Sequence, residues 1–153
     1  MSCVLRAYGA NFDVDSFLKD CLLEPEIVYH RGKPRFPNSS RRLDEVSGMN
    51  ISVSTCEFSD LRGQIDDAIQ FLSDNDQGLQ CLRDFPGFEE MELDFPIEER
   101  DVAVQSDAFP PQLLSLLGAL RIGLVVSRYP VSDDPQAEYS NGVWPQIRRA
   151  PHA

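Results

Sequence analysis

The sequence predicts an α+β domain with an antiparallel-dominated sheet and helices packed on one of its faces. Two observations support this class: several short segments alternate apolar and polar residues, as half-buried strands do, and several others carry apolar residues at helical spacing. In chain order these segments read β-α-β-β-α-(α)-β-(β)-α-β, where the brackets mark a short helix and a short strand. A chain of 153 residues fits one such domain and can bury a core.

In the first half of the chain, alternation predicts strands over residues 3–9, 26–31 and 49–54. The helix after the first strand is predicted over residues 13–23, because Asp13 is a good N-cap and an apolar stripe continues to Leu22. Ser59 can cap a longer second helix. A short helical segment around Leu82 follows it.

The second half of the chain begins with its strictest alternation, at residues 90–95, where the anionic side chains share one face and the apolar ones the other. We expect the anionic face to lie outside and the apolar face to be covered by helices. The prediction is completed by a short strand around Val102 and Val104, an apolar helix that starts at Pro110-Pro111, and a last strand over residues 122–129.

The opening βαββαβ run matches the ferredoxin-like split βαβ arrangement, and an additional αβ unit follows it. Right-handed crossovers would place the helices of such a unit on one side of the sheet. We expect a single α+β domain over residues 1–130. Residues 131–153 are polar, contain proline and lack periodicity, so they are expected to form a loosely ordered tail.

The cysteines and the apolar segments predict a cytoplasmic protein. Cys3, Cys21, Cys56 and Cys81 form no CxxC motif and lie in apolar periodic segments, which is typical of reduced core thiols. The first residues lack a basic region followed by a long apolar run, so they do not read as a signal peptide. No stretch approaches the length of a transmembrane helix.

The charge of the chain is concentrated in one third of its length. The formal net charge is −11, and residues 57–107 hold fifteen carboxylates against three arginines, whereas the other residues hold ten acids and eleven bases. This balance argues against general affinity for nucleic acids or anionic membranes, because those surfaces need Lys and Arg to displace their counterions. It favours a basic partner.

The sequence offers little for catalysis, and we expect no enzyme, no cofactor and no metal. Glu90, Glu92 and Asp94 would lie side by side along a strand with no histidine near them in the sequence, which is typical of a solvated or partner-contacting face. The two histidines, His30 and His152, provide no convincing nucleophile–base pair or zinc set.

We therefore expect a non-enzymatic binding protein that neutralises or escorts a basic protein, either as a monomer or as a weak dimer. An acidic helix face and an acidic strand face would steer the association. The expected partner-binding residues are Asp66, Asp67, Asp74, Glu90, Glu92, Asp94, Glu98 and Glu99.

Two other functions remain open from the residues alone. The basic loop at 30–42 could grip an anionic small molecule through Arg31, Lys33, Arg35, Arg41 and Arg42. It lacks the glycine spacing of a phosphate-binding loop and a helix directly after it. Alternatively, the acidic segment could act as a nucleic-acid mimic that occupies the DNA groove of another protein.

Several landmarks of the chain resemble the DUF4279 family of small bacterial domains, which has no assigned activity. These landmarks are Leu23-Glu24-Pro25, the loop at 32–35, the strand at 49–54, and the helix from Phe109 that runs into the strand ending at Tyr129. The resemblance covers about residues 2–130 and supplies no functional residues. Domains of this kind look similar to those that accompany polymorphic toxins, which implies an immunity protein with a cognate toxin as its basic partner.

Overall fold

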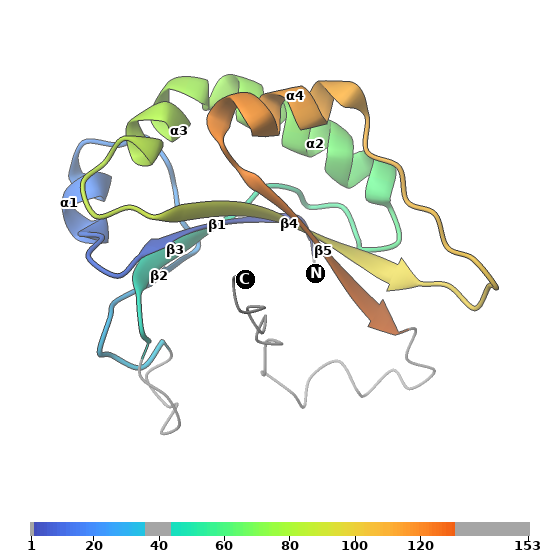
Figure 1. Ribbon diagram of the computed structural model, residues 1–153, viewed down its shortest axis with the longest axis horizontal. Coiled ribbons are helices and arrows are strands. Elements are labelled where there is room, and N and C mark those ends of the chain that lie inside the picture. Colours follow the sequence, from blue (N-terminus) through green and yellow to red (C-terminus); the bar gives the residue numbers. More distant parts are fainter. Residues whose placement is uncertain (1, 36–43, 131–153) are drawn as a thin grey trace, which may run out of the picture.

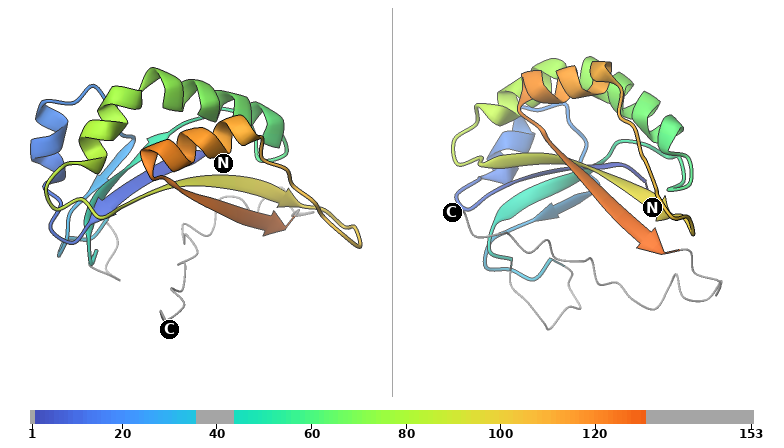
Figure 2. Two further views of the ribbon diagram at one scale, coloured as in Figure 1. Left: turned by 45° about the horizontal axis from the view of Figure 1, so that its top comes forward. Right: turned by 45° about the vertical axis from the view of Figure 1, so that its right-hand side comes forward.

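The computed structural model describes residues 2–35 and 44–130, which form one sheet covered on one side by helices (Figure 1). The strands are β1 (Val4–Gly9), β2 (Ile27–Tyr29), β3 (Ser47–Ser52), β4 (Glu90–Glu99) and β5 (Gly123–Pro130). The helices are α1 (Val14–Lys19), α2 (Leu61–Asp74), α3 (Asp76–Arg83) and α4 (Pro111–Leu120). The expected α+β class and the expected placement of the helices on one face are confirmed (Figure 2).

The strands lie in the order β2-β3-β1-β4-β5. The first three neighbouring pairs are antiparallel, and β4 and β5 are parallel. The parallel pair makes the sheet mixed, because the chain returns from β4 through α4 before it enters β5. Strand β1 therefore lies at the centre, with β3 on one side and β4 on the other.

The core lies between the sheet and the helix layer. Leu5 of β1 and Leu93 of β4 are neighbours in the sheet and are fully buried. Above them pack the apolar faces of α2 and α4, including Leu72 and Leu113, which are also fully buried. Alternate residues of each strand thus enter the core, as the period of two requires, and burial of these side chains is the main favourable contribution to folding.

The structure differs from the sequence-based expectation at the end of the first helix and at the start of the second, while Asp13 caps the first helix as expected. Helix α1 ends at Lys19, and Leu22 is 97% exposed, so the apolar stripe does not continue to Leu22. Leu23 enters the core instead, because the chain leaves the helix after Asp20, whose backbone N–H bonds to the carbonyl of Phe17. The cap of α2 is Asp60 rather than Ser59, since the Asp60 carboxylate accepts the N–H of Gly63.

The strand expected around Val102 and Val104 is not formed. Their side chains are 57% and 80% exposed and lie in a loop between β4 and α4. Side-chain bonds close this loop: the Arg100 guanidinium pairs with Asp107 at 2.6 Å, and the Gln105 amide donates to the carbonyl of Glu98. Strand β4 is longer than expected and continues to Glu99.

Gly87 is a position where the fold requires glycine. Its φ is +80°, and a Cβ there would lie 2.1 Å from the carbonyl oxygen of Asn11, so the turn before β4 packs directly on the chain that leaves β1. Gly118 is the opposite case, because a Cβ on this residue of α4 would meet nothing within 4 Å.

We predict that Gly87→Ala lowers the free energy of unfolding by about 2 kcal/mol or more, because it adds both left-handed strain and a backbone clash. Gly118→Ala should raise the free energy by about 0.5 to 1 kcal/mol, the ordinary preference of a helix for alanine. Urea unfolding followed by circular dichroism measures both. Equal stability of the two variants would contradict the close approach at Gly87.

Candidate functional site

The face of the sheet without helices carries most of the polar strand residues. Strand alternation places Arg6 and Tyr8 of β1 on this open face, beside Glu90 and Glu92 of β4 and Asn50 of β3. The outward position expected for the acidic side chains of residues 90–95 is therefore confirmed for Glu90 and Glu92, whereas Asp94 lies on the same face but is buried. No described helix lies on this side in either view of Figure 2.

A buried ion pair lies at the centre of the open face. The Arg6 guanidinium donates to Asp94 Oδ2 at 2.5 Å, and the Ser127 hydroxyl donates to Asp94 Oδ1 at 2.8 Å. The Asp94 side chain is only 4% exposed. A carboxylate this far from water is stable only when it is paired and hydrogen-bonded, and both of its oxygens are satisfied here. Asp94 thus joins three strands and is not available as a surface charge.

The other carboxylates of β4 retain an excess of negative charge. Tyr8 donates its hydroxyl to Glu90 at 2.9 Å. Burial raises the pKa of the half-buried Glu92, and the carboxylate of Glu90 raises it further, while Arg6 only partly opposes both effects. The surplus charge therefore lies in a partly desolvated setting, where electrostatic interactions are stronger than in water.

A hollow of about 290 Å³ opens on this face next to the ion pair. Its wall is partly apolar and partly polar, and it is formed by Ser2, Val4, Arg6, Glu26, Ile27, Asn50, Ser52, Asp94, Pro96 and Tyr129. Asn50 Oδ1 is shielded from water and has no hydrogen-bond partner in the described part of the chain. Burial and the nearby Asp94 raise the pKa of Tyr129, so its hydroxyl stays protonated.

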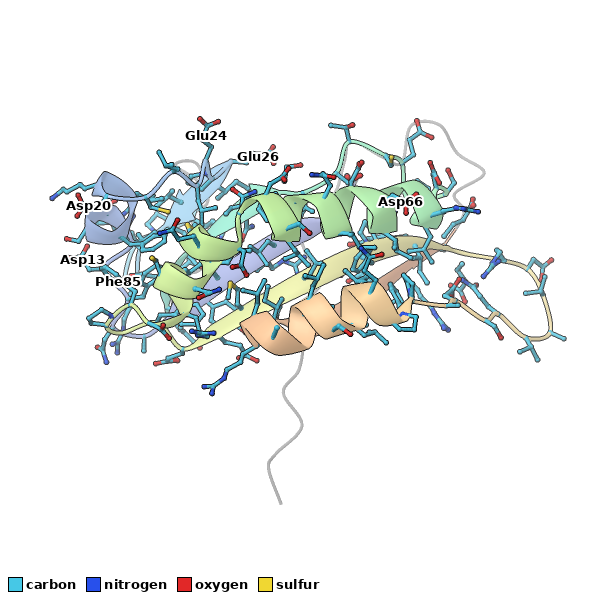
Figure 3. The ribbon with its side chains drawn as sticks, turned by 90° about the horizontal axis from the view of Figure 1, so that it is seen from above. Asp13, Asp20, Glu24, Glu26, Asp66 and Phe85 are labelled. Carbon is cyan, nitrogen blue, oxygen red and sulfur yellow. The ribbon has the colours of Figure 1, made fainter. Side chains whose placement is uncertain are left out.

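The eight residues expected to bind a partner divide between two opposite faces. Asp66 and Asp74 are exposed on the outer side of α2, and Figure 3 shows Asp66 on the helix layer, seen from above. Asp67, on the same helix, accepts a bond from the buried Ser54 at 2.6 Å and is turned inward. Glu90, Glu92, Asp94 and Glu98 lie at alternate positions of β4 on the open sheet face, and Glu99 is exposed at the end of that strand. The eight residues thus form no continuous surface.

The basic loop holds its described arginines in internal contacts. Arg35 forms a two-bond pair with Asp44 and lies 3.7 Å above the ring of Tyr29, while the Arg31 guanidinium donates to the carbonyl of Ala10. Lys33 is exposed. Arg41 and Arg42 lie outside the described residues. Because Arg31 and Arg35 are already bonded, the described part of the loop gives weak support to an anion site.

Other chemistry-bearing groups occur singly or in structural roles. His30 Nε2 lies 2.9 Å from Asp15 Oδ2 on the surface, and the four cysteines form no disulfide. Burial, with Asp94 and Asp67 nearby, raises the pKa of the Cys3 thiol, which keeps it unreactive. Within residues 2–35 and 44–130 there is no group of three or more side chains that could hold a metal ion. None of the described helices has the length and apolar character needed to cross a membrane.

Sequence reasoning missed part of this site. The alternation of the strand at 49–54 puts Asn50 on the face opposite the apolar side chains, but nothing in the sequence indicates that its amide oxygen lacks a hydrogen-bond donor. Glu26, Ser127 and Tyr129 come from strands, or strand ends, whose register with β1 and β4 no local pattern specifies. The hollow is bounded by residues from all five strands, so it depends on the order in which the strands pair.

Comparison with known proteins adds no identification. No family model, no curated protein and no solved structure matches this chain.

We predict that Arg6→Met lowers the free energy of unfolding at pH 7 by about 3 kcal/mol, because it leaves the Asp94 carboxylate buried without its cation. The double variant Arg6→Met/Asp94→Asn should recover most of this loss. Arg128→Met, at an exposed position on β5, serves as the control and should change little. A double variant no more stable than Arg6→Met would show that the pair is not the source of the loss.

We predict that Glu92→Gln raises the free energy of unfolding at pH 7, by less than about 1 kcal/mol because the side chain is partly solvated. The folded state raises the pKa of Glu92, so it holds the proton more tightly than the unfolded chain and loses stability as pH rises through that range. The gain should therefore disappear well below the ordinary glutamate pKa of about 4.3. Denaturation curves between pH 3 and 8, on the order of one per pH unit, test this; a gain that persists at the acid end would contradict it.

Proposed function

We propose that this chain is a non-enzymatic binding protein that neutralises or escorts a basic protein, and that the partner docks on the open face of the sheet. The observation that carries the proposal is the charge of this face. Glu90, Glu92 and Glu98 project from β4 and Glu26 precedes β2, whereas Arg6, which is already paired with Asp94, is the one cation that the described strands contribute there. The neighbouring Arg35–Asp44 pair is neutral overall.

The partial burial of Glu92 supports binding rather than mere solubility. A charge needed only for solubility is best placed where water surrounds it, but Glu92 is half-buried and carries a raised pKa. A cationic surface brought to this face would lower that cost, because it supplies the opposite charge that Arg6 alone does not. Steering of a basic partner follows from the same field.

Two finer expectations belong to this proposal. We propose that β1 to β4 with α1 to α3 are a ferredoxin-like unit to which α4 and β5 are added, and the order β2-β3-β1-β4 with antiparallel neighbours supports it. The resemblance to DUF4279 domains leads us to propose a cytoplasmic immunity protein with a toxin as its partner. The acidic open face is compatible with that role.

The partner can be identified by capture on the tagged full chain from its native host at low salt, with a parallel wash at high salt. A single basic protein in stoichiometric amount that is lost at high salt supports the proposal. A captured protein with an acidic surface, or one retained at high salt, argues against charge-driven docking.

A matched pair of variants tests which face is used. Glu90→Lys/Glu92→Lys and Asp66→Lys/Asp74→Lys change the net charge equally, but on opposite faces of the protein. We predict that the first variant slows association with the captured partner by about tenfold or more at low salt and that the second slows it far less. Surface plasmon resonance at two ionic strengths measures both rates. Equal slowing would show that net charge alone is responsible.

Asp94 is left unchanged in these variants for a structural reason. A lysine at that position would put a second cation beside Arg6 in a site that is almost fully buried, and loss of the fold would then be mistaken for loss of binding.

A further inference from the structure

The hollow on the open face has a chemistry of its own, separate from the charge around it. Its charged lining consists of Arg6, Asp94 and Glu26. The first two neutralise each other at 2.5 Å, which leaves the carboxylate of Glu26 without an opposite charge within the lining. An anion entering the hollow would meet two carboxylates, whereas a cation would be stabilised by Glu26 and by the nearby Glu92.

The hollow also borders an amide oxygen that receives no hydrogen bond. Asn50 Oδ1 is buried without a donor, and leaving such an acceptor unsatisfied is unfavourable. The terminal torsion of an asparagine is soft. A small rotation would therefore let this oxygen accept a hydrogen bond from a donor group bound in the hollow. The hydroxyl of Tyr129, which bonds to none of the described residues, offers a second acceptor in the same lining.

The size and the apolar part of the lining limit what can enter. A volume of about 290 Å³ accommodates one extended side chain, and Val4, Ile27 and Pro96 provide apolar contact for an aliphatic stem. The best match is therefore a group with a hydrocarbon stem and a positively charged tip rich in N–H donors. Such a tip is an alkylammonium or a guanidinium.

We propose that this hollow is the anchor site for a lysine or arginine side chain of the basic partner, with Asn50 Oδ1 accepting from the charged tip and Glu26 providing the opposing carboxylate. The inference rests on the proposed function, since it names the pocket through which the open face holds its partner. The surrounding carboxylates steer the partner to the open face, and the hollow fixes the position in which the partner is held there.

The site can be tested with small probes that need no partner. The ¹⁵N-labelled full chain is titrated with n-butylammonium and n-butylguanidinium, and with 1-butanol and butyrate as the neutral and anionic controls. We expect saturable shifts of the Asn50 side-chain amide and of the backbone amides of Ser52 and Tyr129 with the two cations, and none with the controls. Shifts of these signals with butyrate and not with the cations would overturn the proposal.

Substitutions in the lining test the roles of the residues. Asn50→Leu should weaken cation binding by about tenfold, the usual effect of losing one hydrogen bond to a charged group. Asn11→Leu, an exposed asparagine beyond the end of β1, is the matched control and should bind as the unchanged chain does. Glu26→Gln, at an exposed position that the fold tolerates, should also weaken cation binding. Unchanged binding by both Asn50→Leu and Glu26→Gln would overturn the proposal.

The captured partner separates this inference from the proposed function. Asn50→Leu should weaken partner binding by the same factor while its salt dependence is kept, because the steering charges are untouched. If the partner binds Asn50→Leu as tightly as the unchanged chain, the anchor is wrong and the docking face stands. If the small cations bind at Asn50 and no basic protein does, the hollow takes free amines and the proposed function fails.

Discussion

The contact between Arg6 and Asp94 is the constraint on which the open face depends. It places a full negative charge in the interior of a sheet, and only the guanidinium from β1 and the hydroxyl of Ser127 from β5 make that position tolerable. Because the three groups come from three different strands, the pair is complete only when β1, β4 and β5 are in register. The ion pair on the polar face and the apolar core on the other face therefore require the same order of strands.

The two faces of the sheet have different roles: the helix side stabilises the fold, and the open side carries the polar groups. On the helix side, alternate strand residues and the apolar stripes of α2 and α4 form a core of packed aliphatic and aromatic side chains. On the open side the same strands carry a mixed set of charges, hydroxyls and one unsatisfied amide. Since the stability comes from the first face, the second is free to hold groups that are costly on their own and useful to a cationic partner.

The sequence was informative wherever a local period decided the outcome. Alternation at residues 90–95 fixed which side of β4 is acidic, and helical spacing located α2 and α4. It failed at the end of α1, where Leu22 and Leu23 are equally apolar and only packing decides which one is buried. It also failed at Val102 and Val104, where β-branched residues lie in a loop held closed by Arg100 and Gln105. The site itself was predictable only in part, because Arg6, Asp94 and Asn50 meet through register.

The edge strand β5 shows what this architecture requires at its border. It pairs with β4 on one side and has no neighbour among the described strands on the other, and its Leu124 and Val126 are more than a third exposed. Unpaired backbone N–H and C=O groups beside apolar side chains favour pairing with a strand of another molecule, which leads to aggregation. Arg128 opposes such pairing by its charge, and Pro130 opposes it because it has no backbone N–H. The residues of edge strand β5 themselves therefore reduce its tendency to aggregate.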